Sequence, residues 1–67
     1  MEITQLKKRL IGRNLIVSNE PIVEHAIVND IVFKTEYKEY CITFEKKGFQ
    51  LFLNLESVKR LNPEIEL

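Results

Sequence analysis

The chain contains a single histidine, His25, and a single cysteine, Cys41, two residue types that pair as base and nucleophile in covalent catalysis. Such a pair requires the imidazole and the thiol to lie within hydrogen-bond reach. The strand pairing that the sequence predicts places His25 and Cys41 diagonally across the sheet, with a strand between them. We therefore expect no catalytic pair, and we expect Cys41 to serve as a small half-buried hydrophobic residue.

Other catalytic and metal-binding arrangements are also poorly supported. A zinc site needs three or four converging Cys, His or carboxylate ligands, and one histidine with one distant cysteine supplies too few. Glu24 and Glu36 are predicted outside any apolar pocket that would raise a carboxyl pKa for acid–base work. Gly12 and Gly48 are too far apart for a phosphate-binding loop. We therefore expect a protein that is not an enzyme and has no metal and no cofactor.

Length and composition predict one small globular domain spanning residues 1–67, with 45% hydrophobic residues and two glycines. A single cysteine cannot form an internal disulfide. No apolar run approaches the roughly 20 residues that span a bilayer, and no signal-peptide pattern is present. We expect a cytoplasmic protein that does not contact membranes. Abundant Lys, Ile, Asn and Glu, with no tryptophan, favour an AT-rich genome such as that of a bacterium or its phage.

Three two-residue polar breaks, Asn29-Asp30, Lys38-Glu39 and Lys47-Gly48, separate runs of β-forming residues between Ile22 and Leu55. Two-residue loops are the commonest hairpin connections, and Asn, Asp and Gly tolerate the positive φ that they need. The pattern predicts a strongly twisted antiparallel meander of four strands. In this register Phe33 faces Phe44, and Phe44 faces Leu51.

One face of this meander is almost wholly apolar, as expected of a sheet that covers a core. It carries Ala26, Val28, Ile31, Phe33, Tyr37, Tyr40, Ile42, Phe44, Phe49, Leu51, Leu53 and Leu55. The other face is mixed, and it carries Val23, His25, Ile27, Val32, Lys34, Glu36, Cys41, Thr43, Glu45, Gln50, Phe52 and Asn54.

The segments on either side of the meander predict further elements. Leu6 and Leu10 are four residues apart, which predicts a short helix over Thr4–Ile11, capped by Thr4, ended by Gly12 and packed on the apolar face. Asn14–Ser18 alternates as a further strand, so the sheet has four to five strands. The predicted class is α+β and β-rich.

Two interpretations of the C-terminal segment stay open. Asn54 caps a short helical turn over Leu55–Leu61, or a 3₁₀ turn precedes a closing strand over Val58–Leu61. The second order of elements resembles that of small SH3-like and Sm-like barrels, which implies a sheet closed into a barrel. The glycine- and aspartate-bearing motifs of the Sm family are absent, so no family is assigned. Residues 62–67 are expected to form a disordered tail.

The function most consistent with these features is non-catalytic binding. Apolar residues interrupt the mixed face, and exposed apolar patches mark interaction sites. The candidate protein-binding face comprises His25, Lys34, Thr43, Phe52, Val23 and Val32. We expect a small regulatory protein that binds another protein or a second copy of itself.

Nucleic-acid binding is the alternative function. Basic residues cluster in two segments of a chain whose formal net charge is zero. The candidate anion-binding patch comprises Lys7, Lys8, Arg9, Arg13, Lys46, Lys47, Lys59 and Arg60. Phosphate contacts dominate nucleic-acid affinity, so this function needs several of these cations on one surface.

Overall fold

The structure is a computed structural model that describes residues 2–67. A helix, α1 (Ile3–Leu10), precedes four strands, and a second helix, α2 (Leu55–Leu61), follows them. The strands are β1 (Asn14–Ser18), β2 (Glu24–Lys34), β3 (Glu39–Lys46) and β4 (Phe49–Asn54). They form one antiparallel sheet in the order β1-β2-β3-β4. The predicted α+β meander is confirmed with four strands, and the sheet does not close into a barrel.

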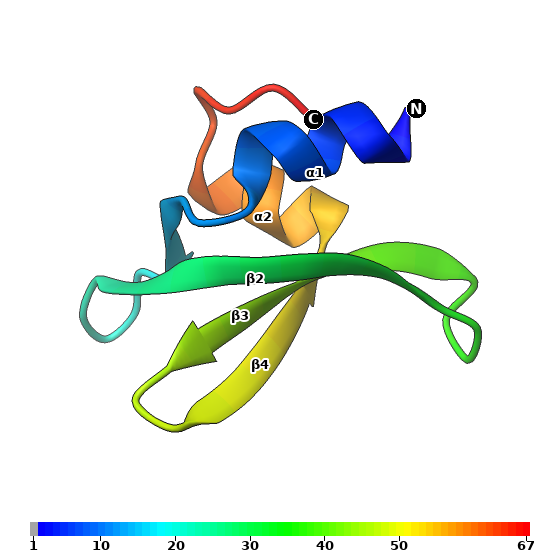
Figure 1. The fold of residues 1–67 in the computed structure, drawn as a ribbon. Coiled ribbons are helices and arrows are strands. Elements are labelled where there is room, and N and C mark those ends of the chain that lie inside the picture. Colours follow the sequence, from blue (N-terminus) through cyan, green and yellow to red (C-terminus); the bar gives the residue numbers. More distant parts are fainter. Residues whose placement is uncertain (1) are drawn as a thin grey trace.

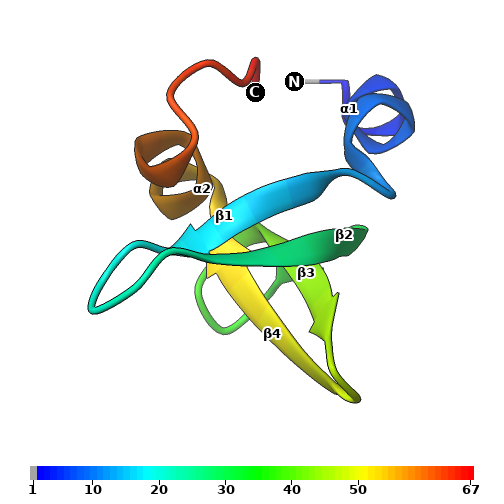
Figure 2. The ribbon, with the colours of Figure 1, turned by 90° about the vertical axis from the view of Figure 1, so that its left-hand side faces the viewer.

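Both helices lie on the same face of the sheet, which we call the inner face (Figure 1, Figure 2). Neither helix is long enough to be stable alone in water, so each is stabilised by packing its apolar side chains into the core. The core consists of Leu6, Leu10, Leu15, Ala26, Val28, Ile31, Ile42, Phe44, Val58 and Ile65. Ile65 lies beyond α2, so the C-terminal segment also contributes to this core.

The expected N-terminal helix is present, one residue earlier than predicted at each end. Thr4 is not its cap. Glu2 caps α1, and its carboxylate accepts a hydrogen bond from the backbone N–H of Thr4 at 2.8 Å. Gly12, at φ +91°, follows the helix in the left-handed conformation that glycine tolerates.

The helical interpretation of the C-terminal segment is confirmed. The Asn54 side chain accepts a hydrogen bond from the backbone N–H of Ser57 at 2.9 Å, which caps α2 as predicted. The alternative closing strand over Val58–Leu61 is not formed.

The predicted Asn29-Asp30 hairpin is wrong. Residues 24–34 form one continuous strand, β2, whose pairing with β3 shifts between Val28 and Asp30. The Asp30 carboxylate accepts a hydrogen bond from the backbone N–H of Ile31 at 2.8 Å. The polar pair therefore forms a bulge within a strand, a role open to the same residue types as a turn.

The β2–β3 connection also differs from the prediction. Thr35–Lys38 form a four-residue turn, so Lys34 pairs with Glu39, and Phe33 pairs with Tyr40 rather than with Phe44. The Phe33 and Tyr40 rings meet edge to face at 5.2 Å between centroids. Phe33 and Tyr37 are more exposed than the predicted apolar face implied.

The Lys47-Gly48 hairpin is confirmed, including its register. Phe44 pairs with Leu51, and Ile42 pairs with Leu53. Lys47 and Gly48 both have positive φ, at 44° and 86°, as a type I′ turn requires.

Candidate functional site

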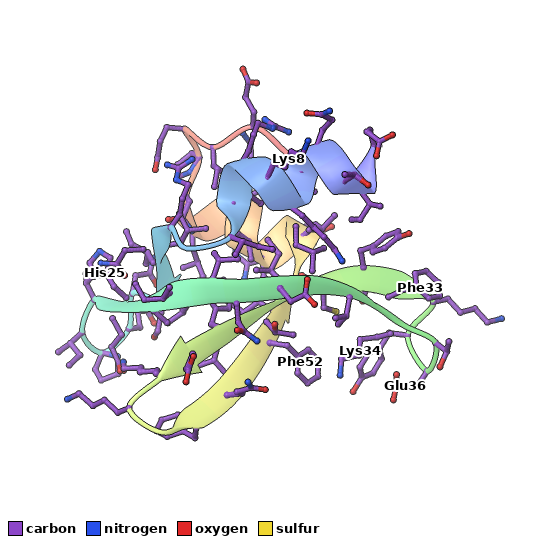
Figure 3. The ribbon with its side chains drawn as sticks, viewed as in Figure 1. Lys8, His25, Phe33, Lys34, Glu36 and Phe52 are labelled. Atoms are coloured by element: carbon purple, nitrogen blue, oxygen red, sulfur yellow. The ribbon has the colours of Figure 1, made fainter. Side chains whose placement is uncertain are left out.

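The side of the sheet opposite the helices, the outer face, carries a cluster centred on Phe52. We call it the Phe52 surface, and it comprises Val32, Lys34, Tyr37, Thr43 and Phe52. Thr43 lies directly opposite Phe52 across the β3–β4 pair. Figure 3 shows Phe52 and Lys34 on the side of the sheet away from α1. Four members of the predicted binding face therefore share one region of the outer face.

Two side chains hold the Phe52 ring in place without covering it. The Lys34 Nζ lies 4.4 Å from the ring centroid, a cation–π geometry. The Tyr37 ring lies 6.2 Å from the Phe52 ring, tilted by 35°. Phe52 nevertheless keeps 42% of its surface exposed, and Tyr37 keeps 57%. The arrangement presents two aromatic rings and a cation together at the surface, which is a typical composition of the centre of a protein contact.

Thr43 fixes the neighbouring backbone of β2. Its Oγ1 donates a hydrogen bond to the carbonyl oxygen of Asp30 at 3.3 Å, and Asp30 is its cross-strand partner. The predicted register, which set Phe33 opposite Phe44, also set Lys34 opposite Thr43, and this pairing is wrong. Lys34 reaches the Phe52 surface through the length of its side chain rather than through direct pairing.

His25 and Val23 do not join the Phe52 surface. His25 pairs with Ile16 of β1 rather than with Lys34, and Val23 lies in the loop before β2. Figure 3 shows His25 at the opposite end of β2 from Lys34. The continuous β2 strand, which replaces the predicted hairpin, causes this separation.

Cys41 is the third residue of β3, lies opposite Val32 and is only 1% exposed. It is more buried than the half-buried position expected. Burial, together with the nearby Glu39 carboxylate, raises the pKa of the Cys41 thiol. Val32, the cross-strand partner of Cys41, is seven residues from His25 along β2, which is on the order of 20 Å for an extended chain. The imidazole of His25 and the thiol of Cys41 therefore do not meet.

Two carboxylates form ion pairs rather than an acid–base pair. The backbone N–H of Ile31 and the ammonium of Lys7, at 3.3 Å, hold the pKa of Asp30 below its usual value. A hydrogen bond from Lys46 and the charge of that ammonium lower the pKa of Glu24. Both carboxylates are stabilised in the charged form, which suits structural pairing.

The predicted basic patch is divided in the structure. Lys7, Lys8 and Arg9 lie in the last turn of α1, and Lys59 and Arg60 lie in the last turn of α2. The β3–β4 turn, which holds Lys47, lies at the far end of the molecule from both helices (Figure 1, Figure 2). The eight cations therefore do not form one surface.

Several of these cations also have partners within the chain. Lys7 pairs with Asp30, Lys46 pairs with Glu24, and Arg9 approaches the Glu66 carboxylate at 3.6 Å. Lys59 donates hydrogen bonds to the carbonyl oxygens of Pro63 and Ile65. These interactions reduce the charge that is free to meet phosphate groups.

The sequence did not indicate the roles of two residues, one in this site and one in the fold that supports it. Tyr37 was assigned to the apolar face, yet its place in the β2–β3 turn brings it against Phe52. Asn62 falls in the segment 62–67 that the sequence predicts as a tail, yet it is 2% exposed and its side chain forms hydrogen bonds to the backbone of β1. Neither residue carries a local pattern that reveals these long-range contacts.

Within residues 2–67, no helix is long and apolar enough to cross a bilayer. The same residues contain no cluster of three or more His, Cys, Asp or Glu side chains that could hold a metal ion, and no pocket. The fold defines the protein as a small α+β domain with an antiparallel meander. Comparison with family models, curated proteins and solved structures gave no significant match.

Proposed function

We propose that this protein is a non-catalytic binding module that contacts another protein chain through the Phe52 surface. The observation that carries the proposal is the exposed Phe52 ring, which lies against Lys34 and Tyr37 on a sheet face of mixed polar and apolar residues. Aromatic residues whose position is already fixed lose little conformational freedom on binding, so they make effective contact anchors.

The composition around Phe52 also suits a protein partner. Val32 and Thr43 flank the rings with apolar and hydrogen-bonding groups, while Lys34 offers a charge near the centre. A small regulatory protein of a bacterium or phage, acting in the cytoplasm, is the role that we assign to such a module. The single buried thiol and the small size support this assignment.

Nucleic-acid binding has weaker support. The basic residues lie at opposite ends of the molecule, and three of them form ion pairs with acidic residues. Proteins that bind single strands also stack bases on exposed aromatics beside a cationic groove. The Phe52 surface, by contrast, combines two aromatic rings with a single cation, Lys34.

The test measures binding of the purified protein to itself, to a partner identified by affinity purification, and to a pool of short DNA and RNA. Phe52→Ala should weaken protein binding at least tenfold, while Ile22→Ala, which removes a more exposed side chain from the distant β1–β2 loop, should leave it unchanged. Equal binding by the wild type and the Phe52 variant would contradict the proposal. Salt-sensitive binding to nucleic acid alone would favour the alternative.

A further inference from the structure

The two edges of the sheet differ in how their backbone groups are satisfied. At the β1 edge, the Asn62 side-chain amide accepts a hydrogen bond from the N–H of Ile16 and donates one to its carbonyl oxygen, both at 3.0 Å. This amide occupies the place of a neighbouring strand. At the other edge, β4 pairs with β3 on one side, and no strand among residues 2–67 pairs with its other side (Figure 1, Figure 2).

The open edge lacks the features that normally prevent strands from pairing with other chains. Natural edge strands carry charges, prolines or bulges, whereas β4 reads Phe-Gln-Leu-Phe-Leu-Asn and has none of these. Both of its aromatic rings are exposed, Phe49 at 58% and Phe52 at 42%. They lie on opposite faces of the sheet, so each face of this edge presents an uncovered ring.

The hairpin turn determines which backbone groups point out of the edge. The residues that flank a two-residue type I′ turn, here Lys46 and Phe49, exchange hydrogen bonds with each other. Pairs then alternate along an antiparallel ladder. The backbone groups of Gln50 and Phe52 therefore point away from β3, toward the open edge.

We propose that a second copy of this chain pairs with β4 in antiparallel orientation, forming a homodimer with one continuous eight-stranded sheet. When the two-fold axis passes between the Phe52 residues of the two copies, the outward-pointing N–H and C=O groups of β4 form hydrogen bonds with the second copy. This axis sets Phe52 opposite Phe52 of the partner subunit, and Gln50 opposite Asn54 of the partner subunit. On the inner face, Leu51 lies opposite Leu53 of the partner subunit. Like residues thus meet across the whole strand.

Charge complementarity favours a second copy over an unrelated peptide. Lys47 precedes β4 and Glu56 follows it, and neither forms an ion pair within residues 2–67. Antiparallel self-pairing brings Lys47 near Glu56 of the partner subunit, and the symmetry repeats this contact. The same pairing brings the exposed Phe49 toward the partner subunit's Leu55 on the inner face.

The capped β1 edge limits the size of the assembly. Because Asn62 already satisfies Ile16 at the middle of β1, the end strands of the dimer are less open to a further chain than β4, which disfavours extension into a filament. This inference rests on the proposed function, since it names a second copy as the protein that Phe52 contacts.

The first test combines solution mass with amide hydrogen exchange. Light scattering should show twice the chain mass of 7.9 kDa at high concentration and the single mass on dilution. The amides of Gln50 and Phe52 should exchange at least tenfold more slowly in the dimer, because pairing places them in a ladder. A protein that stays monomeric, or a dimer whose Gln50 and Phe52 amides exchange as in the monomer, would overturn the inference.

A matched pair of variants separates pairing through the backbone from contact through side chains. Gln50→Pro removes an outward N–H that β3 does not use, whereas Gln50→Ala removes the side chain and keeps the N–H. The proline variant should be monomeric with an unchanged circular dichroism spectrum, and the alanine variant should dimerise. Dimerisation of a folded proline variant would refute the strand pairing.

Charge exchange provides a test that does not depend on how proline is tolerated. Lys47→Glu and Glu56→Lys should each weaken self-association severalfold, since each places like charges together twice. An equimolar mixture of the two variants should restore dimers, because each contact then joins opposite charges. A mixture that associates no better than the separate variants would contradict the register.

These measurements also distinguish the two proposals. A monomer that binds a different protein and loses that binding with Phe52→Ala would overturn the dimer and leave the proposed function standing. A dimer formed through β4 whose association is insensitive to Phe52→Ala would instead remove Phe52 as the anchor.

Discussion

The Asn62 side chain forms hydrogen bonds to both backbone groups of Ile16, although the two residues are 46 positions apart in the sequence. Its amide nitrogen also donates to the carbonyl oxygen of Val58 at 3.0 Å, within α2. One buried amide therefore joins the last helix to the first strand. In doing so it satisfies backbone groups that would otherwise form the exposed edge of β1.

Removing the Asn62 side-chain amide should destabilise the fold more than the substitution of a polar residue usually does. Asn62→Ala leaves the half-buried backbone groups of Ile16 without partners, which should lower the free energy of unfolding by about 2 kcal/mol. Asn62→Asp should also destabilise, because a carboxylate cannot donate to the Ile16 and Val58 carbonyl oxygens. Urea denaturation measures both changes. The control is Asn19→Ala in the exposed β1–β2 loop, and a similar loss there would contradict the assigned role.

Two phenylalanines on the inner side of the sheet should differ sharply in their contribution to stability. Phe44 is completely buried in the core, so Phe44→Ala should cost about 3 to 5 kcal/mol. Phe49 lies on the same face but is exposed, so Phe49→Ala should cost under about 1 kcal/mol. Denaturation is measured at a concentration where the wild type is monomeric. Comparable losses in the two variants would contradict the position of the core.

The sequence allowed the sheet faces to be predicted even where the pairing was wrong. From Asp30 to Lys34, beyond the bulge, the observed β2–β3 register differs from the prediction by four positions, which is an even number. Because side chains alternate with a period of two, Ile31, Ile42 and Phe44 still point to the inner face. The Lys47-Gly48 turn was predictable because glycine readily supplies the positive φ required there.

The bulge at Asn29-Asp30 and the position of His25 could not be predicted in the same way. Residues that tolerate a turn also tolerate a bulge, and long-range pairing with β3 decides between the two. Because the bulge keeps β2 continuous, His25 lies at the opposite end of this strand from Lys34. Tyr37 and Asn62 depend on contacts between distant segments, for which the sequence offers no local signal.

The hydrogen bond from the Ile31 N–H to the Asp30 carboxylate, together with the ion pair to Lys7, should produce a measurable dependence of stability on pH. The pKa of Asp30 is lower in the folded protein than in the unfolded chain, so its contribution is complete above the unfolded pKa and is lost as pH falls through the folded one. Asp30→Asn should therefore be less stable than the wild type at neutral pH. The difference should shrink below about pH 4, where the unfolded carboxyl is protonated.

The matched control for this pH effect is Glu36→Gln, which changes an exposed carboxyl in the β2–β3 turn that forms no ion pair within residues 2–67. Its stability should follow that of the wild type at every pH. A difference between Asp30→Asn and the wild type that stays constant down to acid pH would show that the charge of Asp30 contributes nothing.

Cys41 should report on global unfolding through the rate at which its thiol is alkylated. The side chain is buried on β3, a central strand of the sheet, and burial also raises its pKa, so both access and the thiolate fraction are low in the folded protein. Alkylation followed by mass spectrometry should be slow in native buffer and fast in denaturant. A cysteine introduced by Asn19→Cys in the exposed loop should react quickly in both conditions. β3 lies between β2 and β4, so it cannot expose this thiol by fraying at a sheet edge. Rapid reaction of Cys41 in native buffer would therefore contradict the prediction and would mean that β3 opens without unfolding of the whole domain.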